Sequence, residues 1–404
     1  MAGDSRAGER TAGATKTALR SSQRARAAAG PAGPRRVAGA AWLGVVLLAA
    51  ALVGLTMVTM ATLRGTPSRH TLVVASMPYW NIRHGTEVVL AHRGAVTEVS
   101  PWMYGLDGSG QIDTQYPPGQ AAAVTGDIRR LRSAGLLVVP SLANITGGRW
   151  AYPAVARMLH SPSLMARQVA AIVALVQREQ YAGIDIDYEN LHAADRQAFS
   201  TFITRLGHAL HARGKVLSVA VFAKTTNAGT APFNVAQDYA AIGRAADQVR
   251  LMAYDYHWPT SPPGPIAPVG WVRSVLRYAK TQIPADKIVL GIPLYGYDWS
   301  GGHGTGLSWL QALRLSRRYH VTPRYDAASQ APWFAYTDAA GRRHTVWFEN
   351  AESSRAKFEA AHRAGIAGVY LWMYGYEDSA TWPAVRQVLP ASGPHALSTS
   401  KAVP

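Results

Sequence analysis

The apolar residues of this chain are gathered, from His70 onward, into short runs separated by segments with helical periodicity. Most of the runs are rich in Val, Ile, Leu and aromatic residues, a composition typical of strands that are buried in a parallel sheet. There are eight runs: Leu72–Trp80, Val96–Tyr104, Leu136–Ala143, Ala182–Glu189, Val216–Ala223, Gln248–Tyr256, Ile288–Tyr295 and Ile366–Trp372.

The segments between the runs include three clear helical patterns, Ser163–Gln180, Ala193–Arg213 and Trp271–Thr281. Strands that alternate with helices form a parallel sheet. Eight strand–helix repeats within residues 70–388 therefore predict an α/β fold, a (β/α)8 TIM barrel.

The interval between the seventh and eighth runs, residues 299–349, is too long for a single crossover, and we expect a small α+β insertion there. Its expected parts are a loop at Gly301–Gly304, a helix at Trp309–Tyr319, and a hairpin in which Trp333–Tyr336 and Thr345–Phe348 flank Asp338–Gly341.

The N-terminal 63 residues have a different character. Residues 1–36 carry eight Lys/Arg against Asp4 and Glu9 in an Ala/Gly/Ser/Pro-rich context, which predicts a disordered basic tail. Residues 37–63 carry no charge, and this run exceeds the roughly 20 residues that cross a bilayer. The basic flank predicts that the N-terminus stays in the cytoplasm. We expect a single-pass transmembrane anchor with the barrel outside; secretion after cleavage near Thr59-Met60-Ala61 is the alternative.

Composition narrows the function. The chain has 404 residues, a formal net charge of +17 and no cysteine, which excludes disulfides and Cys-ligated metals. His257, His303 and His344 show no ligand spacing, so we expect neither a metal nor a cofactor. No Arg/aromatic constellation indicates a nucleic acid partner; we expect a monomer, and residues 389–404 are expected to form a disordered tail.

The most informative segment for chemistry is Gly183–Glu189, where Asp185, Asp187 and Glu189 occupy every second position. Because side chains alternate along a strand, the three acids should project from one face. Burying three like charges is costly, and their repulsion pushes the pKa values of neighbouring carboxyl groups apart. The pattern predicts acid/base catalysis; a structural acid network under a barrel mouth is the alternative.

Other polar and aromatic residues end the predicted strands, where the catalytic groups of such barrels lie. A ring of aromatic residues fits a carbohydrate cleft, because sugar faces stack on aromatic rings; packing at the barrel end is the alternative. The candidates for binding substrate are Tyr79, Tyr104, Met252, Asp255, Tyr295 and Trp372.

Three of these segments resemble glycoside hydrolase family 18, the chitinase-like family. Ala182–Glu189 resembles the fourth-strand motif Asp-Gly-x-Asp-x-Asp-x-Glu, Met252–Asp255 resembles Met-x-Tyr-Asp of the sixth strand, and Trp372 resembles the eighth-strand tryptophan. Gly291–Trp299 and Val346–Asn350 resemble the branch with bacterial spore-germination and peptidoglycan-associated members.

The resemblance implies a role for each residue. Glu189 would be the general acid, Asp187 would orient the substrate's N-acetyl group, Tyr254 would donate a hydrogen bond to that group, and Asp185 would support Asp187. Trp372 would form the floor of the sugar site. The N-acetyl oxygen would replace an enzyme nucleophile, as in the substrate-assisted members of this family.

The expected function is therefore that of a retaining glycosidase acting outside the cytoplasm on β-1,4-linked polysaccharides containing N-acetylglucosamine, with peptidoglycan as first substrate and chitin as second. A non-catalytic, lectin-like glycan-binding module is the alternative, and the presence of Glu189 argues against it. The first Asp of the family motif is Ala182 here. That position precedes the strand, so we expect activity to survive.

Overall fold

The computed structural model describes residues 71–389, and the basic segment, the uncharged run 37–63 and the segment 390–404 lie outside this range. Eight parallel strands form a closed barrel, because β1 pairs with both β17 and β2. The prediction of eight parallel strands is confirmed. In order around the barrel they are β1 (Leu72–Pro78), β17 (Gly368–Trp372), β11 (Ile288–Pro293), β10 (Gln248–Met252), β9 (Val216–Phe222), β8 (Gly183–Asp187), β5 (Ser141–Ala143) and β2 (Glu98–Leu106).

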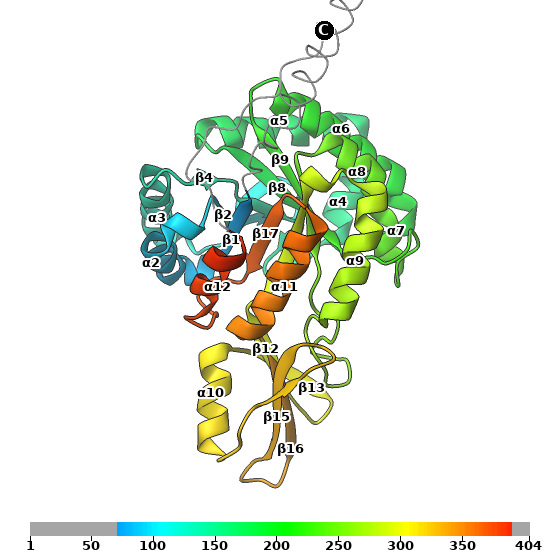
Figure 1. Ribbon diagram of the computed structural model, residues 1–404. Helices are drawn as coiled ribbons and strands as arrows, with labels where there is room; N and C mark the ends of the chain where they lie inside the picture. Colours follow the sequence, from blue (N-terminus) through cyan, green and yellow to red (C-terminus); the bar gives the residue numbers. More distant parts are fainter. Residues whose placement is uncertain (1–70, 390–404) are drawn as a thin grey trace, which may run out of the picture. The chain divides into compact units, whose positions relative to one another are not determined.

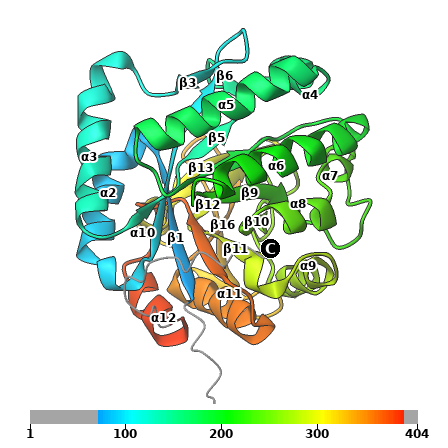
Figure 2. The same cartoon turned by 90° about the horizontal axis from the view of Figure 1, so that it is seen from above.

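Helices surround the strands (Figure 2). They are α2 (Ile82–Ala91), α3 (Ala121–Ser133), α4 (Tyr152–Leu159), α5 (Pro162–Arg178), α6 (Arg196–His211), α7 (Pro232–Ala236), α8 (Tyr239–Ala245), α9 (Val269–Gln282), α11 (Ala351–Ala364) and α12 (Thr381–Val388). Local sequence signals set their ends: Ser161 caps the first turn of α5 before Pro162, and Gly365 ends α11 in the left-handed conformation that glycine adopts without strain.

Short strands complete the barrel wall. The predicted third run is divided into β4 (Leu137–Val138) and β5, and β3 (Ile112–Thr114) pairs antiparallel with the end of β2. A small hairpin, β6 (Ile145–Thr146) and β7 (Arg149–Trp150), follows β5.

The segment between β11 and α11 is a separate α+β layer (Figure 1). Its antiparallel sheet has the order β13 (His303–Ser308), β12 (Tyr295–Ser300), β16 (Arg343–Phe348), β15 (Ala331–Thr337) and β14 (Arg324–Asp326), with α10 (Trp309–Arg318) beside it. The layer begins at Tyr295, four residues before the expected boundary, because the apolar run of β11 continues into β12. Only Gly301 and Gly302 form the expected loop; His303 and Gly304 already belong to β13.

The two faces of the barrel strands carry different chemistry. On β8, Ile184 and Ile186 are buried among apolar side chains, whereas Asp185 and Asp187 are buried among polar ones. The barrel interior is therefore built around charges at its centre, and these position the site. Within residues 71–389 no single helix is both long and apolar enough to span a membrane, although α4 and α5, bent by 110°, meet the length and composition test as a pair.

Candidate active site

Asp185 lies at the centre of the barrel, between two serines that face it from the neighbouring strands. Ser141 of β5 and Ser218 of β9 are its register partners, so all three side chains project inward. The Ser141 hydroxyl donates to Asp185 Oδ2 at 2.8 Å, and the Ser218 hydroxyl donates to Oδ1 at 2.6 Å. Asp185 is thereby fixed below the mouth of the barrel.

A buried ion pair, which no local pattern of the sequence indicates, adjoins Asp185. Arg250 Nη2 donates to Glu98 Oε1 at 2.5 Å, while Arg250 Nη1 lies 3.2 Å from Asp185 Oδ2. Gln248 donates to the second Glu98 oxygen at 2.7 Å. Burial raises the pKa of Glu98, and the positive charge of Arg250 opposes that shift. One arginine therefore compensates two buried acids.

Asp187 is one step closer to the barrel mouth. Its Oδ2 accepts a hydrogen bond from Trp102 Nε1 at 2.9 Å, and its Oδ1 is buried without a partner among the described residues. Burial and the charge of Asp185 raise the pKa of Asp187 to about 7, against the opposing effects of Trp102 and Arg250. Asp187 can therefore exchange a proton near neutral pH.

Glu189 lies two residues beyond Asp187, after the end of β8. The side chain of Asn144 fixes its backbone: Oδ1 accepts from Glu189 N at 2.8 Å, and Nδ2 donates to Glu189 O at 2.9 Å. Burial, followed by the charges of Asp187 and Asp255, raises the pKa of Glu189 well above its ordinary value. Its carboxyl group makes no hydrogen bond with another described residue. Its surroundings therefore favour the protonated form of a carboxyl group that is not bonded to another described side chain, as a general acid requires.

Tyr254 follows β10. Burial raises the pKa of its phenol, its neighbour Tyr370 adds to that shift, and the nearby charges of Asp187 and Glu189 add smaller contributions. Its hydroxyl is 2.7 Å from the hydroxyl of Tyr370. Met252 is buried in the same layer of the barrel interior as Tyr370. Tyr254 packs against the same cluster, so Met252 belongs to the apolar surroundings of the tyrosine pair.

Trp372 at the end of β17 and Tyr295 at the start of the insertion pack in one aromatic cluster. The ring of Trp372 lies 6.3 Å from that of Trp102, between ring centroids, and packs against a cluster that includes Tyr295. Tyr295 and Tyr297 of β12 donate to Asp255 Oδ1 at 2.5 and 2.9 Å. Burial of the Asp255 carboxyl group raises its pKa, and these two bonds oppose that shift.

The comparisons with known proteins agree with this geometry. Residues 119–377 match the family described as Glycosyl hydrolases family 18. The chain belongs to this family and is a glycoside hydrolase.

Three relatives place the chain within family 18. The chain is 35% identical over 231 residues to a cortical fragment-lytic enzyme of Bacillus subtilis, a match that covers 56% of this chain and 54% of that protein. The structure of a chitinase from Chromobacterium violaceum superposes with a TM-score of 0.74 at 34% identity, covering 79% of this chain and 99% of the other. The spore cortex-lytic enzyme SleL of Bacillus cereus superposes with a TM-score of 0.71 at 26% identity, covering 79% and 74%. These matches agree with the resemblance to the spore and peptidoglycan branch of the family.

Two of the candidate residues lie away from the family 18 acids. Strand alternation would place Tyr104 beside Trp102, but the register between β2 and β5 shifts between these two residues. Such a bulge turns the following side chains. Tyr104 is buried on the outer side of the wall, where its hydroxyl is 2.8 Å from that of Tyr181.

Tyr79, the other candidate for binding substrate that lies apart from the acids, is also placed by an irregular backbone. It begins a 3-10 turn after the end of β1, packs against the main core, and faces a cavity beside α2 and α3. Trp80 is the exposed aromatic residue here, with 51% of its surface accessible, and its ring lies 5.8 Å from that of Trp102. Trp80 lies in the turn beyond the end of β1, so strand alternation does not fix its direction.

Ala182, the departure from the family 18 motif, lies just before β8. Its backbone joins the two neighbouring segments: its N–H donates to Val138 O, and its carbonyl accepts from Val216 N, both at 2.9 Å. Position 182 therefore lies outside the group of buried acids formed by Asp185, Asp187, Glu189 and Asp255. Within the described range 71–389, no group of three or more His, Asp or Glu side chains could hold a metal ion.

Proposed function

We propose that this glycoside hydrolase is a retaining enzyme that cleaves β-1,4-linked glycans containing N-acetylglucosamine by substrate-assisted catalysis. The observation that carries the proposal is the carboxyl group of Glu189, whose pKa is raised well above its ordinary value beside Asp187. A carboxyl group that stays protonated near neutral pH can protonate a leaving oxygen.

In the proposed reaction, Glu189 gives its proton to the glycosidic oxygen as the carbonyl oxygen of the substrate's N-acetyl group attacks the anomeric carbon. The leaving sugar departs with the proton. Asp187 orients the N–H of the acetamido group, and the Tyr254 hydroxyl donates to its oxygen. Water then opens the cyclic intermediate, returning a proton to Glu189. Two inversions at the anomeric carbon give retention.

Peptidoglycan is the first proposed substrate and a chitin-like glycan is the second. The similarity to a cortical fragment-lytic enzyme and to a spore cortex-lytic enzyme supports the first, and the similarity to a chitinase supports the second. We further propose that residues 37–63 anchor the chain in the membrane with the barrel on the outer side; this run lies outside the described residues.

The test compares full-length wild type, Glu189→Gln and the control Glu352→Gln, an exposed glutamate at the start of α11. Each is incubated with purified peptidoglycan and with chito-oligosaccharides, and products are followed by mass spectrometry and by NMR of the first anomer released. We expect Glu189→Gln to be about 10²- to 10⁴-fold slower and Glu352→Gln to match wild type.

Equal release by wild type and Glu189→Gln would refute the role of Glu189. Binding to insoluble glycan with no turnover by wild type would instead support a lectin-like module. Initial release of the inverted anomer would exclude a retaining mechanism.

A further inference from the structure

The helical layer around the barrel is interrupted beside β2. Helix α2 packs on α3, and α5 packs on α6, but α3 and α5 make no comparable contact (Figure 2). Met103 points outward by strand alternation and Tyr104 joins it because of the bulge in β2, whereas Trp102 faces Asp187 inside the barrel. Strand β2 thus contacts Asp187 on its inner side and lines a second surface on its outer side.

Two adjoining cavities occupy this interval, with volumes of about 340 and 900 Å³. They share Tyr104, Thr114 and Arg178 in their walls. The smaller lies between α3 and the end of α5, and the larger continues along α5 toward α4. Volumes of this size are typical of ligand pockets.

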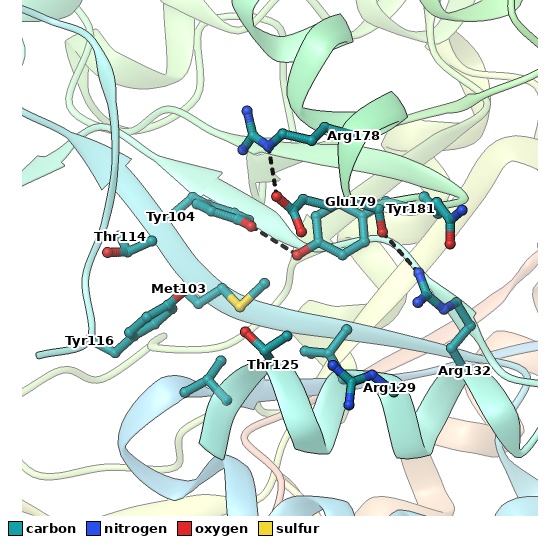
Figure 3. A pocket seen from close by; sticks show the side chains of 13 residues that line it. Met103, Tyr104, Thr114, Tyr116, Thr125, Arg129, Arg132, Arg178, Glu179 and Tyr181 are labelled. Carbon is teal, nitrogen blue, oxygen red and sulfur yellow. Dashed lines mark hydrogen bonds and ion pairs between the residues drawn. The ribbon is translucent and has the colours of Figure 1, made fainter. Parts of the chain in front are cut away.

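Arginines dominate the charge of these walls, and we call the surface the arginine groove. Its five arginines are Arg129 and Arg132 of α3, Arg157 of α4, and Arg167 and Arg178 of α5. Figure 3 shows that Arg178 approaches the smaller cavity from one side and that Arg129 and Arg132 approach it from α3.

The acids of the arginine groove do not balance this charge. Asp113 and Glu179 are the two carboxylates in its walls, and Glu179 pairs with Arg178 at 2.8 Å. Arg132 donates to the backbone carbonyl of Glu179 at 2.9 Å, which leaves its charge uncompensated. The guanidinium group of Arg129 makes neither a hydrogen bond nor an ion pair with another residue in the described range. Guanidinium groups remain free for an anion.

Aromatic and amide groups accompany the arginines. The hydroxyls of Tyr104 and Tyr181 meet at 2.8 Å in the wall of the smaller cavity, and Tyr116 is half-buried beside them. Gln180 has a φ of 56° at the position after α5 where glycine is the usual residue. Its side chain lines the cavity at a conformational cost that glycine would avoid.

We propose that the arginine groove is a second, non-catalytic binding site for an acidic saccharide, a glycan chain that bears carboxylate groups. Arginine forks pair with carboxylates, the half-buried Tyr116 offers a ring to a sugar face, and the exposed Gln180 offers hydrogen bonds. The site holds an anionic polymer on the outer wall of the barrel while the cleft cuts a segment of it. Binding at the groove does not depend on turnover at Glu189.

The test uses full-length Glu189→Gln protein, so that no probe is cleaved, and calorimetric titration with two tetrasaccharides. One alternates N-acetylglucosamine with N-acetylmuramic acid and has free lactyl carboxylates; the other is chitotetraose, which has the same linkage and no charge. We expect the acidic probe to bind at least about tenfold more tightly.

Two double variants, each of which loses two arginines, then test whether the arginine groove causes this difference in affinity between the two probes. Arg129→Gln with Arg178→Gln should remove it, whereas Arg273→Gln with Arg277→Gln, exposed on α9, should leave it intact. Gln180→Gly should weaken binding of the acidic probe without lowering Tm, a combination that a purely structural role would not give.

The proposed site would be refuted if the double variant of Arg129 and Arg178 kept the tenfold preference for the acidic probe. It would also be refuted if the double variant of Arg273 and Arg277 lost that preference to the same extent. Displacement of the acidic probe by a poly(glycerol phosphate) chain of equal charge would refute the saccharide assignment. Failure of wild type to hydrolyse any glycan would count against the proposed function and leave this binding result unaffected.

Discussion

Replacing Arg250 with methionine tests the buried ion pair under the active site. Methionine fills a similar volume but removes the positive charge that lies between Glu98 and Asp185. Both carboxylates would remain buried, each still bonded to neutral donors such as Gln248 and Ser218. The substitution therefore isolates the electrostatic role of the guanidinium group.

The expected loss is large compared with the total stability of a domain. Arg250 makes close contacts with Glu98 at 2.5 Å, with the Ser100 hydroxyl at 2.6 Å and with Asp185 at 3.2 Å. Removing one partner of such a buried pair costs about 3–5 kcal/mol, a sizeable part of the roughly 5–15 kcal/mol that holds a typical domain folded. We expect a loss of about 4 kcal/mol at pH 7.

The loss should shrink in acid. Burial raises the pKa of Glu98 in the folded protein, and without Arg250 this pKa should rise further. The folded state then binds more protons than the unfolded state, so stability falls as pH rises and recovers as pH falls. The variant should be less destabilised at pH 5 than at pH 7.

The assay is urea denaturation of the full-length protein followed by tryptophan fluorescence and circular dichroism at both pH values. Glu98→Gln is combined with Arg250→Met to complete a double-mutant cycle. We expect the double variant to regain at least about 1.5 kcal/mol relative to Arg250→Met, because one uncompensated charge is gone. A loss below about 1 kcal/mol, or no recovery in the double variant, would refute the reasoning.

Three further substitutions have defined outcomes. Asp255→Asn removes a charge that raises the pKa of Glu189, so the alkaline limb of the kcat/KM profile should move to lower pH; an unmoved limb would contradict this. Tyr254→Phe should lower kcat on chito-oligosaccharides about 10²- to 10³-fold, and an undiminished kcat would remove its hydroxyl from the mechanism. Gly183→Ala would bring a Cβ to 2.2 Å from a backbone oxygen of β9 and should cost about 3 kcal/mol or more in thermal unfolding. The control Gly126→Ala in α3 meets no atom within 4 Å and should stabilise by roughly 0.5–1 kcal/mol; equal effects of the two would contradict the crowding argument.

Strand positions and the inward direction of Asp185 and Asp187 followed from sequence because they depend on local periodicity. A parallel strand buried on both sides is apolar almost throughout, and its side chains alternate without exception until it ends or bulges. Glu189 lies past the end of β8, so alternation alone does not fix its direction; Asn144 does so through its two bonds to the backbone.

The remaining parts of the site depend on contacts between distant segments. Glu98 and Arg250 are 152 residues apart, and only the closure of the barrel brings them together. Tyr104 follows a bulge in β2 that no local sequence pattern predicts. Long-range register and irregular backbone are tertiary properties, which explains why single-sequence periodicity did not reveal them.

The two tyrosines of β12 that bond Asp255 link the insertion to the loop after β10, segments 40 residues apart between Tyr295 and Asp255. Asp255 also contributes to the acid strength of Glu189. A chimera that exchanges the insertion for that of a relative would therefore change the pKa of Glu189 unless the loop after β10 were exchanged with it. Recombination and directed evolution of this enzyme should therefore vary the two segments together, because a change in either one alters the environment of the Glu189 carboxyl group.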